Sequence, residues 1–187
     1  MVFAGGGLIP LEPVAETGSY AGQALDVLGN TAVVGHKIDD VYALRFYEHT
    51  LKGWNPTEVV EIGSRRGISV AFGADFLGVA LSGSGNAGVV LEPSKSGWVV
   101  TADLPNPDPS RFNSFSLAAS SDGAIFIACN DAKQQYRDAV LVFERGGGGW
   151  QFVQTIAPWS ASCTLFAEAL DAAGDMLVVG ATSVLGS

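Results

Sequence analysis

A short pattern occurs three times in the chain, and it limits the folds that the chain can adopt. The pattern is Glu, four residues, Gly, Trp, and each copy separates one apolar run from a second extended run. A glycine turn between two such runs predicts a β-hairpin, in which the large Trp ring opens the returning strand. The copies are Glu48 to Trp54, Glu92 to Trp98 and Glu144 to Trp150.

A second pattern lies upstream of each hairpin and occurs four times. It is a turn rich in Gly, Asn and Asp, followed by a β-rich run that ends in a small residue. Turn residues of this kind tolerate a positive φ, as a tight hairpin requires. The runs are Thr31 to Gly35, Phe76 to Ala80, Ala124 to Ala128 and Met176 to Gly180. Their starts are about 45 to 52 residues apart, which is the length of one four-stranded propeller blade.

The fourth copy reaches the end of the sequence before its hairpin, and the missing hairpin has a counterpart at the other end. Met1 to Leu11 resembles the stretch that begins at Leu141. We therefore expect an all-β fold, a small β-propeller of about four four-stranded blades, with the ring closed by N- and C-terminal strands that share one blade. A β-sandwich with accidental internal similarity is the alternative.

The expected blades divide a single domain covering residues 1–187. They are residues 20–62, 67–104 and 114–157, and a shared blade built from inner strands in 164–187 and outer strands in 1–15. Residues 166–173 have good helix propensity. Their start nevertheless matches the equivalent segments that begin at Ala21, Ile68 and Phe115, so the repeat predicts a strand there.

The two patterns together resemble the FG-GAP, or integrin-α-like, propeller repeat. The resemblance rests on Gly174 to Ala181 and on Val140 to Arg145 with Trp150. It implies a propeller fold and no particular ligand. Propellers of that family commonly have seven blades, so this chain could be a complete four-bladed ring, a piece of a larger ring, or half of a ring made from two chains.

Family blades often carry a calcium loop with alternating Asp residues, and the chain has no such loop. The nearest stretch is Asn130 and Asp131 with Asp138, whose spacing does not match alternating ligands. We therefore expect no cofactor and no metal, with calcium as the alternative.

The charge balance narrows the classes of partner. The formal net charge is −9 and only 16% of the residues are charged. An acidic chain is repelled by phosphates and by anionic lipid surfaces, so we expect no nucleic acid and no membrane insertion.

No apolar run approaches the roughly 20 residues that span a bilayer. Met1 to Gly7 lacks the charged and apolar regions of a signal peptide. A removed presequence would leave the same chain, so the sequence assigns no compartment.

In a propeller, the loops between second and third strands and the connections between blades lie on one face. Long polar loops on a rigid scaffold are favoured places for recognition. The longest such loop here runs from Cys129 to Asp138. The candidate binding residues of this face are Tyr20, His36, Asp39, Asp40, Arg66, Arg111, Asn130, Asp131, Gln135, Tyr136, Arg137, Asp138 and Trp159.

Four features of the sequence invite sharper interpretations. His36 with Asp39 and Asp40 suggests catalysis or a metal, but one histidine and two loop carboxylates do not make a converging ligand set. Cys129 and Cys163 are expected on the same face of neighbouring blades, so a disulfide between them is one hypothesis and two free thiols are the other. The Trp and Phe residues recur in step with the blades and are expected to pack between them. Tyr20 and Trp159 fall outside this rhythm and could stack on a sugar or a partner.

No nucleophile elbow, phosphate loop or Cys-x-x-Cys motif is present, so the sequence assigns no catalytic residue. We expect a non-catalytic binding or scaffold module that acts through contacts with another protein or with its own copies. A carbohydrate-binding propeller lectin is the alternative, and a hydrolase using the propeller funnel is the second alternative.

Overall fold

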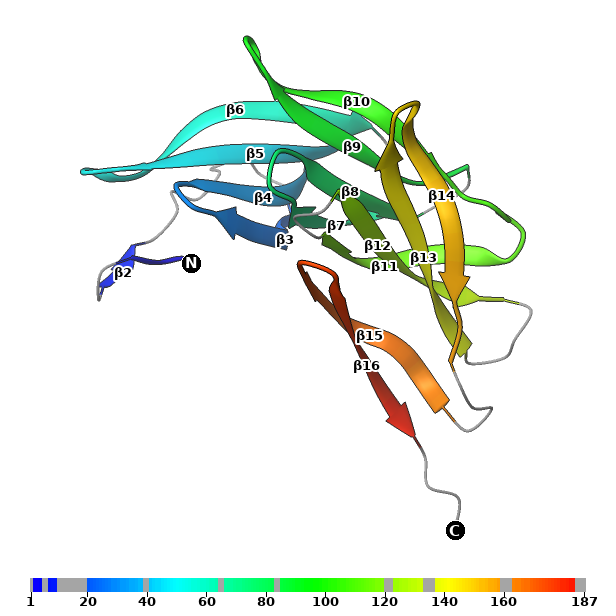
Figure 1. The fold of residues 1–187 in the computed structure, drawn as a ribbon. Helices are drawn as coiled ribbons and strands as arrows, with labels where there is room; N and C mark the ends of the chain where they lie inside the picture. Colours follow the sequence, from blue (N-terminus) through cyan, green and yellow to red (C-terminus); the bar gives the residue numbers. More distant parts are fainter. Residues whose placement is uncertain are drawn as a thin grey trace. The chain divides into compact units, whose positions relative to one another are not determined.

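The computed structural model describes residues 2–4, 7–9, 20–38, 41–63, 66–82, 85–119, 123–132, 137–158 and 163–183, and all the regular structure in these ranges is β (Figure 1). None of these residues forms a helix of the length and apolarity that crossing a membrane requires. The strands are β1 (Val2–Ala4), β2 (Gly7–Ile9), β3 (Tyr20–Leu28), β4 (Thr31–Ile38), β5 (Val41–Thr50), β6 (Gly53–Gly63), β7 (Arg66–Phe72), β8 (Leu77–Ser82), β9 (Asn86–Ser94), β10 (Gly97–Pro105), β11 (Phe112–Ala119), β12 (Ala124–Asp131), β13 (Arg137–Gly146), β14 (Gly149–Ile156), β15 (Cys163–Ala173) and β16 (Met176–Ser183).

The strands form antiparallel sheets in which sequence neighbours are also spatial neighbours. Three sheets have four strands each, in the orders β3-β4-β5-β6, β7-β8-β9-β10 and β11-β12-β13-β14. Two further sheets are hairpins, β15-β16 and β1-β2. The fold is that of a four-bladed β-propeller, as the repeat predicts. We call the sheets that begin with β3, β7, β11 and β15 blades 1 to 4.

The chain divides into two compact units, Met1–Arg65 and Arg66–Ser187. The first contains blade 1 and the β1-β2 hairpin, and the second contains blades 2, 3 and 4. The β1-β2 and β15-β16 hairpins are separate two-stranded sheets. Their union in one shared blade therefore stays a prediction.

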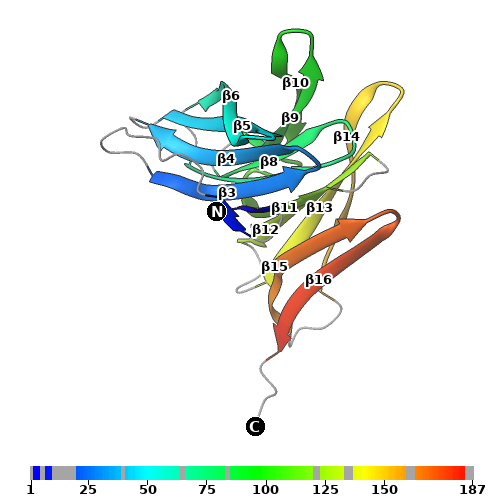
Figure 2. The same ribbon diagram turned by 90° about the vertical axis from the view of Figure 1, so that its left-hand side faces the viewer.

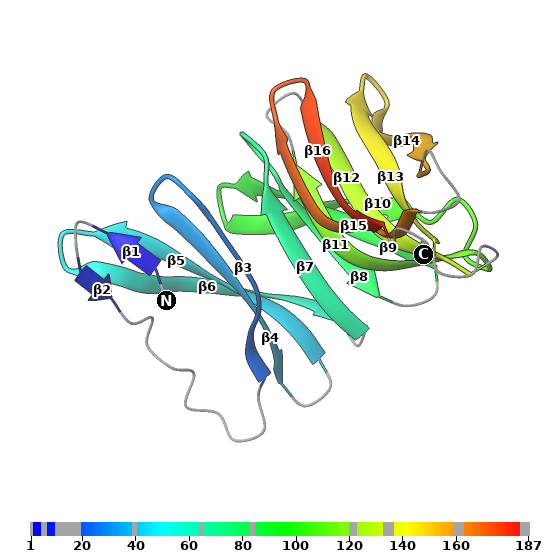
Figure 3. The same cartoon turned by 90° about the horizontal axis from the view of Figure 1, so that it is seen from below.

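Within the second unit, the first strands of successive blades lie next to one another, β7 beside β11 and β11 beside β15 (Figure 3). A continuous apolar core includes residues of blades 2 and 3. Its largest members are Phe76, Phe112 and Phe143. Burying each of these side chains stabilises the fold by about 2 kcal/mol. The interface between blades is therefore the main hydrophobic core of this unit.

The opposite face of blade 3 packs on blade 4, whose two strands form a long hairpin (Figure 2). Ala128 and Val140 of blade 3 cluster with Phe166, and Leu177 and Val179 pack against this cluster. Side chains alternate between the faces of a strand. Neighbouring residues of β12 therefore serve two different interfaces, with Ile127 facing blade 2 and Ala128 facing blade 4.

The repeated Glu-x₄-Gly-Trp pattern forms the same hairpin in blades 1, 2 and 3. Its glycine has a positive φ in each copy, 106° at Gly53, 112° at Gly97 and 99° at Gly149. Only glycine adopts such angles without strain. Each returning strand also bulges three residues after its Trp, because Thr57, Thr101 and Val153 have no partner in the ladder. The sequence repeat thus encodes both a turn and a bulge.

Residues 163–173 form strand β15, as the repeat predicts in spite of their helix propensity. The ladder with β16 skips two residues between Phe166 and Ala169. β3 skips two residues in the same way, between Ala21 and Ala24. Within the bulge of β15, Ala167 is buried and has a φ of 65°, the one positive value among described residues other than glycine. The segment that favours a helix locally is therefore a strand interrupted by a two-residue bulge.

We predict that Gly149→Ala destabilises the protein by about 1–2 kcal/mol, the cost of placing an L-residue at a positive φ. A Cβ at Gly149 would meet no atom within 4 Å, so the effect would come from the backbone alone. Gly147 in the same turn has equal space and no positive φ, so Gly147→Ala is the matched control. Urea unfolding measures both variants, and equal midpoints would contradict the prediction.

Candidate functional site

Blade 3 brings two predicted loop regions together at one end of its sheet. The connection from blade 2 enters β11 at Phe112, and Phe112 pairs with Asp131 at the end of β12. Asp131 in turn pairs with Arg137 at the start of β13. We call this region, residues 106–113, 130–132 and 137–138, the blade 3 loop end. The expectation that such connections share one face holds for this blade.

An ion pair lies at the centre of the blade 3 loop end. Arg111 Nη2 donates a short hydrogen bond to Asp131 Oδ2, and the Asp131 side chain is only 4% exposed. This bond raises the pKa of the Arg111 guanidinium above its ordinary value. The guanidinium also lies over the ring of Phe112, 4.7 Å from its centroid. The carboxylate of Asp131 is therefore held by a cation and is not free to act as a base.

Backbone hydrogen bonds brace the two connections against each other. Ala132 N donates to Arg111 O at 2.8 Å, and Arg111 N donates to Asp108 O at 2.9 Å. The buried Asn106 donates from Nδ2 to Phe112 O at 2.9 Å and accepts from Asp108 N at 3.2 Å. The connection between β10 and β11, which contains Pro107 and Pro109, is thus a fixed turn. It presents Asp108 and Ser110 on a rigid support, next to Asn113 at the start of β11.

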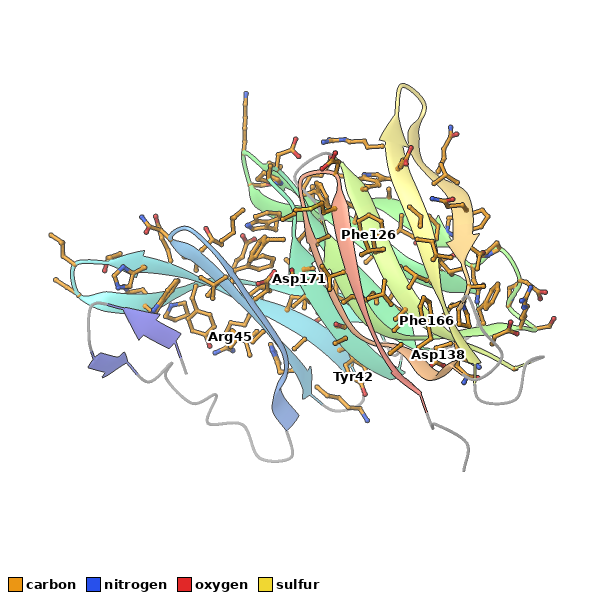
Figure 4. All side chains as sticks on the ribbon, turned by 60° about the horizontal axis from the view of Figure 1, so that its bottom comes forward. Tyr42, Arg45, Phe126, Asp138, Phe166 and Asp171 are labelled. Atoms are coloured by element: carbon orange, nitrogen blue, oxygen red, sulfur yellow. The ribbon has the colours of Figure 1, made fainter. Side chains whose placement is uncertain are left out.

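A row of polar residues crosses the other face of the sheet at this end. Asn113, Asn130 and Asp138 are directly paired across β11, β12 and β13. Asn130 Nδ2 donates to Asp138 Oδ1 at 3.2 Å. In Figure 4, the labelled residues Asp138 and Phe166 lie near the start of β13. The row therefore borders the interface between blades 3 and 4.

The acidic residues of this region do not converge as cation ligands would. Adjacent strand residues point to opposite faces, so Asp131 lies with Arg111 on one side while Asn130 and Asp138 lie on the other. Among the residues that the structure describes, no group of three His, Cys, Asp or Glu side chains could hold a metal ion.

Cys129 is a buried free thiol, and its Sγ donates to Ala139 O at 3.3 Å. The pKa of Cys129 is raised to about 12, mainly by burial and in smaller part by the nearby Asp131 and Asp138, while the bond to Ala139 O and the charge of Arg111 act in the opposite direction. A thiol with this pKa remains protonated near neutrality and is a poor nucleophile. The predicted disulfide partner, Cys163, begins β15, but its side chain lies outside the described residues.

Of the remaining candidate residues, only His36 has a side chain that the structure describes, and it lies in blade 1. His36 was expected near an exposed loop, but it lies within β4 and is only 1% exposed, paired across the sheet with Ala21 and Ala43. Tyr20, Arg66 and Arg137 lie in β3, β7 and β13, and their side chains are outside the described part of the chain. Also outside it are Asp39, Asp40, Gln135, Tyr136 and Trp159.

Sequence reasoning missed an ion-pair network at the opposite end of the same interface. Arg145 donates from Nη1 to Asp75 Oδ2 at 2.9 Å and from Nη2 to Glu92 Oε1. Glu92 is the glutamate of the repeated pattern in blade 2, and Arg145 directly follows the equivalent Glu144 in blade 3. The repeated pattern contains Glu92 and Arg145, but it does not indicate that the glutamate of one blade contacts the arginine of the next blade.

The three tryptophans of the repeated pattern each contact an aromatic ring, but only Trp150 does so between blades, as the sequence predicts, whereas Trp54 and Trp98 contact rings of their own blades. Trp54 lies 5.0 Å from His49, Trp98 lies 5.7 Å from Phe72, and Trp150 lies 4.7 Å from Phe76 between ring centroids. The contact of Trp150 with Phe76 joins blade 3 to blade 2. These rings therefore contribute to the packing of the fold.

No protein-family model matches the chain, and no curated protein sequence matches it.

We predict that Cys129 in the folded protein reacts with iodoacetamide at pH 8 at least about a hundredfold more slowly than an unfolded thiol, because its raised pKa and its burial both suppress the thiolate. A Cys163→Ser variant makes Cys129 the only thiol, and mass spectrometry measures its labelling. Fast labelling of the folded protein would contradict this assignment.

The raised pKa of Cys129 also predicts that folding stability is unaffected below about pH 9 and falls as the pH rises toward 12, because the unfolded thiol loses its proton first.

We predict that Arg111→Met and Asp131→Asn each lower the urea midpoint, because each leaves one partner of the ion pair without its counter-charge. The double variant should lose less stability than the sum of the two single losses, since the two residues act on each other. Additive losses in this double-mutant cycle would show that the pair does not brace the blade 3 loop end.

Proposed function

We propose that the chain is a non-catalytic binding module, and that its blade 3 loop end contacts another protein. We further propose that it is a divergent FG-GAP, or integrin-α-like, propeller. The observation that supports the first proposal most is the bracing of two chain connections by the Arg111–Asp131 pair and the hydrogen bonds around Asn106. A surface that is already ordered loses little conformational entropy when a partner binds.

The chemistry of the described groups favours binding over catalysis. Cys129 is buried and protonated near neutrality, because burial raises its pKa to about 12. Asp131 is held by Arg111, and Asn130 holds Asp138 through one carboxylate oxygen. Groups that are neutralised or already bonded serve to shape a surface. A general base or nucleophile must instead be accessible and have a pKa near the pH at which the enzyme works.

The exposed groups of this surface suit recognition of a polar protein surface. Ser110 donates to Asp108 Oδ1, which fixes the carboxylate in the turn. Asn113 is exposed beside Asn130, so an amide is available both to donate and to accept hydrogen bonds. An amide pair on neighbouring strands and a carboxylate fixed in the braced turn would contribute directional contacts.

The proposal predicts that a partner is lost when the blade 3 loop end is altered. Immobilised wild-type protein, Asn113→Arg and Ser96→Arg would be compared by affinity capture with quantitative mass spectrometry. Asn113 lies on the proposed surface, whereas Ser96 is exposed in the turn between β9 and β10. We expect one protein to be retained near equal stoichiometry by the wild type and by Ser96→Arg, and at least about tenfold less by Asn113→Arg, a loss of about 1.4 kcal/mol.

Two results would count against the proposal. Equal capture by all three proteins would exclude the blade 3 loop end as the contact surface. Binding of the same proteins to a glycan array, together with no retained protein partner, would favour the propeller lectin instead.

A further inference from the structure

We propose that Arg145, Asp75 and Glu92 form an ionic latch, which opens at high salt concentration and lets one end of the interface between blades 2 and 3 separate. The latch lies at the end of this interface opposite to the blade 3 loop end. The inference therefore holds whether or not the blade 3 loop end binds another protein.

One guanidinium joins the two blades in the latch. Arg145, in β13 of blade 3, donates to Asp75 between β7 and β8 and to Glu92 in β9, and both acceptors belong to blade 2. The hydrogen bond to Asp75 and the charges of both carboxylates raise the pKa of the Arg145 guanidinium above its ordinary value. Two carboxylates that share one cation would repel each other if that cation were withdrawn. Arg145 therefore offsets a repulsion within blade 2 and also ties blade 3 to it.

An aromatic contact between the blades lies next to the latch. The guanidinium of Arg145 lies over the ring of Trp150, 6.0 Å from its centroid, and Trp150 packs edge-on against Phe76 of blade 2 with centroids 4.7 Å apart. Trp150 Nε1 is buried and has no hydrogen-bond partner within the described part of the chain. Packing alone shields this N–H from water, so it becomes hydrated when this end of the interface opens.

The latch is open to dissolved ions, whereas the carboxylate at the other end of the interface is not. The side chains of Arg145 and Asp75 are 37% and 66% exposed. The side chain of Asp131, which pairs with Arg111 at the blade 3 loop end, is only 4% exposed. Salt screens exposed charges much more strongly than buried ones. Raising the salt concentration therefore weakens the interface at the latch and leaves the blade 3 loop end held.

Hydrogen exchange of the indole N–H groups, followed by NMR, would test the proposal between about 10 mM and about 1 M NaCl, over which the Debye length falls from about 30 Å to about 3 Å. Trp54 Nε1 is the internal control, because it is also buried without a hydrogen-bond partner and belongs to blade 1, which contributes no residue to the latch. We expect the Trp150 N–H to exchange at least about threefold faster at high salt, as the loss of exposed ion pairs predicts, and the Trp54 N–H to keep its rate. Equal changes at the two indoles would overturn the proposal.

Two variants would identify the latch as the cause. Arg145→Met removes the guanidinium, so the Trp150 N–H should exchange at least about threefold faster than in the wild type at low salt, and salt should no longer change its rate. Lys95→Met is the matched control, because Lys95 is an exposed cation in the turn between β9 and β10 of blade 2. It should leave the exchange of both indoles unchanged. A Trp150 rate that still rises with salt in Arg145→Met, or that rises equally in Lys95→Met, would overturn the proposal.

A third variant keeps the test valid if Arg145→Met does not fold. Glu92→Gln removes one of the two acceptor charges and keeps a side chain of the same length. We expect it to give Trp150 N–H exchange between the rates of the wild type and of Arg145→Met, with a smaller dependence on salt. The rate at Trp54 shows in each variant whether the protein remains folded. A wild-type salt dependence in a folded Glu92→Gln would contradict the latch.

Discussion

The packing of one sheet face on the next is the constraint on which the second unit depends. Blade 3 has little interior of its own, because a sheet one strand layer thick cannot bury either face alone. Its residues at Ile125, Ile127 and Cys129 are buried only because blade 2 covers them. Phe126 and Ala128 contact blade 4 in the same way. Each blade is therefore stable through its neighbours, and a change in one interface affects both sheets that share it.

Sequence reasoning succeeded where one residue type is required by local backbone geometry. The glycines of the repeated pattern adopt positive φ angles, and the runs between turns form the expected strands, since both features depend on residues close in the chain. The strand over residues 163–173 was predicted from the repeat even though Phe166 to Ala173 favours a helix locally. Packing of alternate residues against blade 3 and pairing with β16 prevail over that preference.

The parts that sequence reasoning did not predict depend on contacts between residues far apart in the chain. Arg111 and Asp131 were both named as candidates for binding, yet the structure uses them mainly to hold each other. His36 was grouped with exposed loop residues, because the end of β4 could not be placed closely enough to show that this histidine lies inside the sheet. The Arg145 network joins residues 53 and 70 positions apart, and a one-dimensional pattern does not indicate such a meeting.

The left-handed backbone at Ala167 has a consequence for how this sequence can vary. A β-branched residue there would meet a positive φ that its side chain does not tolerate, and any larger side chain would have to fit a position that is only 4% exposed. Glycine satisfies both conditions, and the equivalent bulge in blade 1 contains Gly22. Alternative sequences of this fold should therefore interchange alanine and glycine at this position and exclude valine, isoleucine and threonine.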